Sequence, residues 1–423
     1  MNRRTLLKNL ATLPLAVPLA RWKSTLPFES HLETGQLPPV VSASMWSYLW
    51  DFVDEGYDSA LGRIKDNGMN AVSLACAYHT GRFLVPHNPK RKIVFLEDGT
   101  IYFRPNPKLY GKVKPIVNSL VNEGHGLAQV KKHADALQLQ TNAWVVSCHN
   151  TALGMKYPEI ACETAFGDKL SHNLCPTNEL VRAYLHAVVR DIASHDVGRI
   201  ELEALQFQGF THGYHHEREG IPLNPAMKFL LGLCFCPSCM NNAKQAKVEI
   251  DAIRRFTRDT LERHFAEPSK ETFKSPEELP KEIVEPFLDW RKTVLVSLAQ
   301  ELVDAVKGTA VKLRPLISFD PSARMVVGAD PKRMAAVTGG ILVPGYVSDP
   351  PALREPLTAL QSMVGAGEII VGFQVGLPES GGKPQFLERL KIARELGISR
   401  FNFYNYGFIP YSHFGWIKEA LAS

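Results

Sequence analysis

The sequence lacks the features that mark membrane-spanning and nucleic-acid-binding proteins. No apolar run reaches the roughly 20 residues that a membrane helix needs. Apart from Lys90-Arg91-Lys92 there is no dense block of Lys and Arg, and the net charge is only +5 over 423 residues. Nucleic-acid binding usually needs a concentrated basic patch, so we expect no nucleic-acid partner and no membrane span in the mature protein. The 45% hydrophobic and 22% charged residues indicate a globular protein with a full core.

A dinucleotide-binding fingerprint is also missing, because no Gly-x-Gly-x-x-Gly follows the first predicted strand. Strand-like and helical patterns instead alternate through the chain. The eight predicted strands cover residues 40–50, 70–79, 141–150, 198–208, 310–320, 340–347, 368–376 and 399–407. Eight strand-helix units predict an α/β fold, a (β/α)8 TIM barrel, with an open α/β sheet plus a helical subdomain as the alternative.

Two insertions interrupt the predicted barrel domain, which covers residues 40–423. A hairpin is expected over residues 91–105 after strand two, with Asp98-Gly99 as its turn. A long helical insertion is expected over about residues 209–308 after strand four. Its Glu-, Lys- and Pro-rich part, residues 267–286, is typical of a solvated linker.

The N-terminus has the layout of an export signal over residues 1–20, followed by a lead-in segment over residues 21–39. Arg3-Arg4 precede Thr5-Leu6-Leu7-Lys8 and a modest apolar stretch, which resembles a twin-arginine signal. The resemblance implies a bacterial periplasmic or secreted protein that uses the twin-arginine export machinery. An amphipathic N-terminal helix is the alternative.

Polar and aromatic residues recur where the predicted strands end, which is where TIM-barrel enzymes place their chemistry. Aromatic rings can stack on sugar faces while amides and imidazoles bind hydroxyls, so this set predicts a carbohydrate substrate. The candidate substrate-binding residues are Trp46, Tyr78, His79, His149, Asn150, Gln206, His212, His215, His216, Glu217, Tyr346, Gln374, Tyr404, Asn405 and Tyr406. A second copy of the chain, in a homo-oligomer, is a further candidate partner.

Glu203 is the sharpest catalytic candidate. Glu201 and Glu203 alternate with apolar residues in strand four, and Glu203 lies nearer the carboxyl end, so we expect Glu201 to pair with a basic side chain lower in the barrel. Glycoside hydrolysis needs two carboxyl groups, and Asp320 at the end of strand five is the first choice for the second. Glu217, Asp349 and Glu379 are weaker choices.

The loop from His212 to Glu217 leaves an alternative function open. Its His and Glu side chains could hold a catalytic metal in a sugar hydrolase or isomerase, although the spacing does not match a His-Glu-x-x-His helix.

Three cysteines stand close together in "CFCPSC", at positions 234, 236 and 239. A Cys-x-Cys disulfide is strained, whereas thiolates at this spacing suit a tetrahedral structural zinc site that needs one more ligand. Cys76 and Cys148 fall within apolar strands, which leaves Cys162 and Cys175 as the cysteine candidates. Loop cysteines that are reduced or disulfide-linked are the alternative.

The run "HNLCPTNELVRAYLHAVVRDI", the strand-four Glu and "CFCPSC" together resemble the glycoside hydrolase family 42 β-galactosidases. The resemblance implies a structural zinc held by Cys175, Cys234, Cys236 and Cys239. It also has limits: Leu202 precedes Glu203 where the family has Asn, and Gln374 stands where the family has its nucleophilic Glu. We therefore expect a divergent glycosidase-like barrel, with a non-catalytic carbohydrate-binding barrel as an alternative.

Overall fold

The computed structural model describes residues 37–211, 217–270 and 273–423, and the histidines at positions 212, 215 and 216 and the predicted export signal lie outside these ranges. Residues 38–423 form one compact unit. No helix of the described residues is both long and apolar enough to cross a lipid bilayer.

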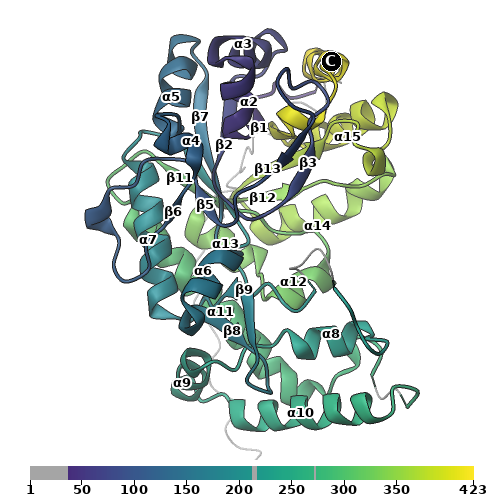
Figure 1. Ribbon diagram of the computed structural model, residues 1–423. Coiled ribbons are helices and arrows are strands. Elements are labelled where there is room, and N and C mark those ends of the chain that lie inside the picture. The colour runs from purple at the N-terminus through teal and green to yellow at the C-terminus, as the bar shows by residue number, and fades with distance from the viewer. Residues whose placement is uncertain (1–36, 212–216, 271–272) are drawn as a thin grey trace, which may run out of the picture. The chain divides into compact units, whose positions relative to one another are not determined.

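Eight parallel strands form the barrel that the strand-helix alternation predicted (Figure 1). They are β1 (Ser42–Ser47), β2 (Ala71–Tyr78), β7 (Gln140–Val146), β10 (Arg199–Glu203), β11 (Lys312–Pro315), β12 (Gly340–Pro344), β13 (Glu368–Gln374) and β14 (Arg400–Tyr404). The strands pair in the order β11-β10-β7-β2-β1-β14-β13-β12. A bridge between Leu316 and Leu342 joins the two ends of this order, so the sheet closes on itself.

Helices follow the strands and pack around them. They are α2 (Leu49–Glu55), α3 (Tyr57–Asp66), α4 (Ser119–Asn122), α5 (Leu127–Ala136), α6 (Thr151–Lys156), α7 (Glu179–Ala193), α11 (Lys281–Ala305), α12 (Pro321–Val327), α13 (Pro331–Thr338), α14 (Arg354–Val364), α15 (Lys383–Glu395) and α16 (Tyr411–Ala422). The first strand is shorter than the predicted range of residues 40–50. It ends at Ser47 because the Tyr48 backbone N–H donates to the Asp51 carboxylate and opens α2.

The insertion after β2 pairs differently from the prediction. Short strands β3 (Arg82–Leu84) and β4 (Ile93–Phe95) form the hairpin, whereas β5 (Thr100–Ile101) pairs with β2 and with β6 (Ile116–Val117). The predicted hairpin over residues 91–105 was therefore wrong in its partners, since the residues after Asp98-Gly99 join the barrel sheet. Phe83 packs inward against the rings of Tyr48 and Phe408, which fixes this hairpin over the barrel.

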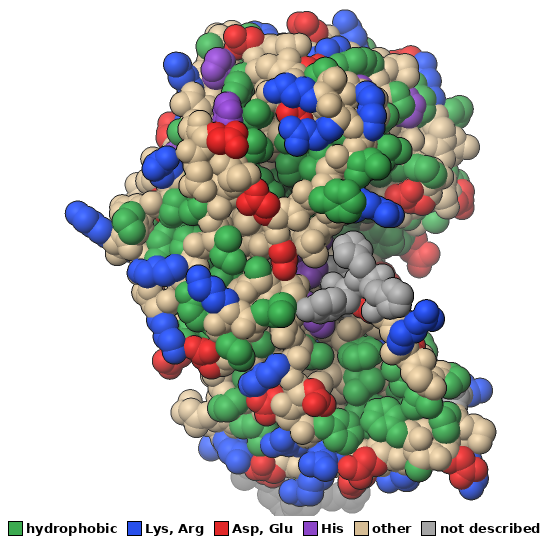
Figure 2. Space-filling model, viewed as in Figure 1, with side chains coloured by type: hydrophobic (Ala, Val, Ile, Leu, Met, Phe, Trp, Pro, Cys, Tyr) green, Lys and Arg blue, Asp and Glu red, His purple; other side chains and the backbone are tan. Residues whose placement is uncertain are grey.

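Elements outside the barrel enclose a second core. They are the hairpin of β8 (Ala161–Glu163) and β9 (Lys169–Leu174), with α8 (Pro225–Leu231), α9 (Pro237–Gln245), α10 (Ile250–Ala266) and the start of α11, and they lie together below the barrel in Figure 1. The prediction of a linker through residue 286 was wrong at its end, because α11 already begins at Lys281 and Val284 is buried in this second core. Acidic and basic side chains intermingle over the face shown in Figure 2.

Candidate active site

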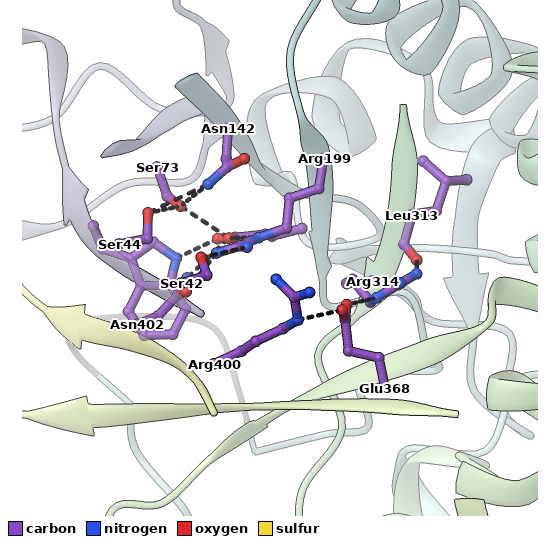
Figure 3. Close-up of polar contacts among 12 residues, drawn as sticks. Ser42, Ser44, Ser73, Asn142, Arg199, Leu313, Arg314, Glu368, Arg400 and Asn402 are labelled. Atoms are coloured by element: carbon purple, nitrogen blue, oxygen red, sulfur yellow. Dashed lines mark hydrogen bonds and ion pairs between the residues drawn. The ribbon is translucent and has the colours of Figure 1, made fainter. Parts of the chain in front are cut away.

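The interior of the barrel is polar toward the N-terminal ends of the strands (Figure 3). We call this end of the interior the lower level, and the end at the carboxyl ends of the strands the upper level, whatever the view. Glu201 is fully buried and accepts hydrogen bonds from Arg199 Nε (2.7 Å), Asn402 Nδ2 (2.8 Å) and Ser73 Oγ (2.8 Å). Trp46 Nε1 donates to its other oxygen at 2.6 Å. Glu201 therefore has a cation and three neutral donors, and the expectation that it pairs with a basic side chain is confirmed.

Glu203 lies on the same face of β10 as Glu201, because side chains two residues apart in a strand point the same way. It is nearer the carboxyl end of the strand. It is partly exposed, and Trp144 Nε1 donates to its Oε2 at 2.6 Å. Loss of water around the carboxyl group raises the pKa of Glu203 to about 7, and the Trp144 hydrogen bond opposes that rise. Near neutral pH this group can hold a proton and still release it.

Aromatic side chains surround the Glu203 carboxyl group. The Trp144 ring lies 4.9 Å from the Tyr78 ring and 6.1 Å from the Tyr404 ring, centroid to centroid. Tyr346 lies 6.0 Å from Tyr404 and is 38% exposed, so this aromatic group reaches solvent. Burial and the Glu203 charge both raise the pKa of the Tyr78 and Tyr346 hydroxyls well above the usual value, so these hydroxyls remain neutral donors.

Gln374 also belongs to the upper level of the barrel interior. A Cβ on Gly372 would come within 2.5 Å of the Trp46 ring, so Gly372 faces inward, and Gln374, two residues later, faces the same way. Gln374 stands beside Tyr404 in the β13–β14 register, and its Nε2 donates to Glu379 Oε1 at 3.0 Å.

Two predicted histidines lie together at the ends of their strands. The His79 and His149 rings stack at 4.2 Å between centroids, and the His79 ring stacks on Tyr78 at 4.5 Å. The structure thus connects His79 with the aromatic group around Glu203. Gln206 and Glu217 are partly or fully exposed on the segment that leaves β10.

Four other predicted residues have structural contacts instead of an open face. Trp46 is only 1% exposed and lies below Glu203, bound to Glu201. Asn150 caps α6 through Leu153 N, and Asn405 accepts from Gly407 N. Tyr406 is fully buried and its hydroxyl donates to Glu55, so the structure gives Tyr406 a packing role in place of the predicted contact with substrate.

Asp320, the predicted second carboxylate, is the N-cap of α12. Its Oδ1 accepts from Ser322 N at 3.0 Å, and the depression that it lines is formed with side chains of α12 and α14, such as Arg324 and Met363. Neither Glu203 nor Tyr404 lines that depression.

Trp144 and Tyr48 are residues that the sequence analysis missed. Trp144 is two residues after the inward-facing Asn142, so the period of two along β7 was the signal that could have revealed it. Tyr48 comes directly after the first strand and stacks on Trp50 at 4.3 Å, which no sequence pattern indicated.

The four cysteines of the predicted zinc site meet in the second core. Cys175, Cys234, Cys236 and Cys239 are all buried, and their sulfur atoms lie within 4.8 Å of one another. Three of the separations, from Cys175 Sγ to the others, are 3.4–3.9 Å. Four thiolates at about 2.3 Å around one zinc would stand about 3.8 Å apart, so these residues fit a tetrahedral metal ion.

Two groups beside the cysteines suit a bound metal. The Glu163 backbone N–H donates to Cys234 Sγ at 3.4 Å, as a second-layer donor to a thiolate would. The buried Arg291 guanidinium feels the charge of Cys234 and Cys239, although burial is the larger effect and lowers the pKa of Arg291 to about 10.

The fold is similar to those of known carbohydrate-active proteins. The glycoside hydrolase domain of PgaB (BpsB) from Bordetella bronchiseptica is 13% identical, with 88% of this chain and 95% of that one covered and a TM-score of 0.56. The β-galactosidase of the Antarctic haloarchaeon Halorubrum lacusprofundi is 10% identical, with 90% of this chain and 58% of that one covered and a TM-score of 0.55. The β-galactosidase of Marinomonas ef1 is 9% identical, with 86% and 54% covered and a TM-score of 0.50.

These similarities establish the barrel fold and nothing finer. This chain spans little more than half the length of the two β-galactosidase chains. No protein-family model matches the sequence, and no curated protein matches it.

Proposed function

We propose that the protein is a glycoside hydrolase-like enzyme that acts on an oligosaccharide or glycoside, with Glu203 as its general acid. The observation that carries this proposal is the place of the Glu203 carboxyl group, at the carboxyl end of a barrel strand and among aromatic rings, where loss of water raises its pKa to about 7. Glycosidic cleavage needs a proton on the leaving oxygen, and a carboxyl group with a raised pKa can supply it at neutral pH.

The neighbouring side chains suit a sugar ring. Tyr346 offers a partly exposed aromatic face, and Tyr78 and Tyr404 offer phenolic hydroxyls that stay neutral. His79 extends the same group of rings. We propose that these four side chains bind the substrate around Glu203.

The test is hydrolysis of a panel of p-nitrophenyl glycosides and oligosaccharides by the purified protein. Glu203→Gln keeps the shape of the side chain and removes the transferable proton. We expect kcat/KM to fall about 10²–10⁴-fold, because general-acid catalysis contributes that much. The matched control is Glu388→Gln, an exposed glutamate on α15. Full activity of Glu203→Gln would remove Glu203 from the chemistry, and sugar binding without turnover by the wild type would favour a non-catalytic barrel.

We further propose that the four cysteines hold one structural zinc ion. The ion would tie the start of α9 to the segment before α7, and so fix the second core, which is built from the segments that follow β7 and β10. Metal analysis should give about one zinc per chain, and Cys175→Ser should lose it with a drop in thermal stability. Two metals per chain would instead favour a catalytic metal on the loop from His212 to Glu217.

We propose export through the twin-arginine route to the periplasm or the medium, on the strength of Arg3-Arg4 and the residues that follow this pair. The paired substitution of Arg3 and Arg4 by Lys should leave the protein in the cytoplasm of a bacterial host, as measured by fractionation. Unchanged export of that variant would contradict the proposal.

A further inference from the structure

The second carboxyl group of the proposed hydrolysis is the open part of the site. We propose that Glu379, held by Gln374, is the general base that activates water in an inverting reaction. This inference rests on the proposed function and adds a residue and a stereochemical outcome to it.

The first support is the position of Gln374. The side chain faces into the barrel at the carboxyl end of β13, in register with Tyr404 on β14. It is only 9% exposed, yet its amide reaches the edge of the barrel, where Nε2 donates to Glu379 Oε1 at 3.0 Å. A nearly buried strand-end side chain therefore points at an exposed carboxylate and fixes one of its oxygens.

The second support is that Glu379 and Glu203 both lie near the hydroxyl group of Tyr404 and influence its pKa. Burial is the main cause that raises the pKa of Tyr404 to about 12, and the charges of both Glu203 and Glu379 add to it. The Tyr404 ring lies 6.1 Å from the ring of Trp144, which holds Glu203. The geometry agrees, because Tyr404 also pairs in register with Gln374, which binds Glu379. The groups that hold the two carboxylates therefore both lie beside Tyr404.

The two carboxyl groups have contrasting surroundings, as an acid and a base require. Loss of water around the Glu203 carboxyl group favours its protonated form, and the hydrogen bond from Trp144 only partly opposes this. Glu379 is exposed in the 3-10 turn Pro378–Ser380 and accepts an amide hydrogen bond. Solvent reaches this exposed carboxylate, and a base that takes a proton from water needs that access.

Gln374 also explains why the reaction would invert. A carboxylate at the end of β13 could attack the sugar directly, but the amide of Gln374 occupies that position and cannot. Gln374 binds Glu379 at the end of its amide, so the Glu379 carboxylate lies farther from the strand than a carboxylate at position 374 would. Inverting glycosidases need such a separation, because a water molecule must fit between the base and the sugar.

The proposed step balances as an ordinary hydrolysis. Glu379 takes a proton from water while the water oxygen bonds to the anomeric carbon. The bond from that carbon to the leaving oxygen breaks, and Glu203 gives its proton to that oxygen. The products are a hemiacetal of inverted configuration and a free hydroxyl, and both carboxyl groups return to their first state by proton exchange with solvent.

Asp320 is the rival for this role. Its carboxylate caps α12, and its depression is shared with α14. Asn is as good an N-cap as Asp, so Asp320→Asn preserves the helix while it removes the charge. The pair Glu379→Gln and Asp320→Asn therefore separates the two candidates without unfolding the protein.

The kinetic experiment measures kcat/KM for a glycoside that the wild type hydrolyses, and follows the anomeric configuration of the first product by proton NMR. We expect Glu379→Gln to lose about 10²–10⁴ in kcat/KM, Glu388→Gln to stay within twofold of the wild type, and the product to be inverted. A retained configuration, or a fully active Glu379→Gln, would overturn the inference and leave Glu203 as the acid untouched. So would a loss in Asp320→Asn with Glu379→Gln active.

A binding experiment needs no turnover. Protonated iminosugars such as 1-deoxynojirimycin and its galacto isomer carry a positive charge near the place of the anomeric carbon. Calorimetry should show at least a tenfold weaker affinity in Glu379→Gln than in Glu388→Gln. Equal affinities in these two variants would overturn the inference, and a wild type that binds no iminosugar and hydrolyses no glycoside would contradict the proposed function itself.

Discussion

Glu201 and Glu203 are two glutamates on one face of one strand, and the barrel treats them in opposite ways. Glu201 receives a hydrogen bond from each of four side chains, and one of these is the cation of Arg199. Glu203, about 7 Å further along a strand by its rise, receives a neutral donor from Trp144. Glu201 is thus paired with a cation, whereas loss of water raises the pKa of Glu203 to about 7. The comparison shows how one strand can place two like side chains in contrasting surroundings.

The largest effect should come from breaking the lower site. Glu201→Gln removes the carboxylate that forms an ion pair with Arg199 and leaves the buried Arg199 cation without that partner. Loss of one partner of a buried ion pair typically costs about 3–5 kcal/mol in the free energy of unfolding. Urea unfolding measures this. A change below about 1 kcal/mol would show that the ion pair does not support the barrel.

A substitution of Glu203, in the upper site, should stabilise the fold at high pH, whereas Glu201→Gln should destabilise it. The pKa of Glu203 is raised in the folded state from 4.5 to about 7, so its proton stabilises the fold below pH 4.5, and this contribution is lost as the pH rises through 7. Glu203→Gln should therefore be more stable than the wild type at pH 8, with a smaller difference at pH 4. Unfolding curves at the two pH values test this, and a variant that is less stable at pH 8 would contradict the account.

The smallest effect should be on the pKa of Glu203, when the hydrogen bond that Trp144 donates to it is removed. The Trp144 hydrogen bond lowers the pKa of Glu203, so Trp144→Phe should raise that pKa further, by up to about one unit. The alkaline limb of the activity profile should then move to higher pH. A shift to lower pH would mean that Trp144 does not bind the charged form.

The barrel and its lower site could largely be predicted from the sequence. The alternation of strands and helices has eight repeats, and the period of two places Arg199, Glu201 and Glu203 on one face. The choice of Glu203 as the candidate acid followed from its place nearer the strand end. Cys175 and the "CFCPSC" cluster could be grouped from their spacing and the resemblance that they carry.

The rest depended on contacts between distant segments. Gln374 and Glu379 belong to a strand and its following turn, and only the fold shows that one side chain reaches the other beside Tyr404. Tyr406 looked equivalent to Tyr404, but α16 and Glu55 cover it. Asp320 follows a strand like a catalytic residue, yet Pro321 starts a helix there and turns the carboxylate into a cap. No local pattern distinguishes these outcomes.

The most direct test of the account is the titration of Glu203 itself. Carbon-13 NMR of glutamate carboxyl groups, with Glu203→Gln to assign the resonance, gives its pKa in the intact protein. The account predicts a midpoint near 7. A midpoint near the ordinary value of 4.5 would contradict it, because Glu203 would then be charged at neutral pH and could not serve as the acid.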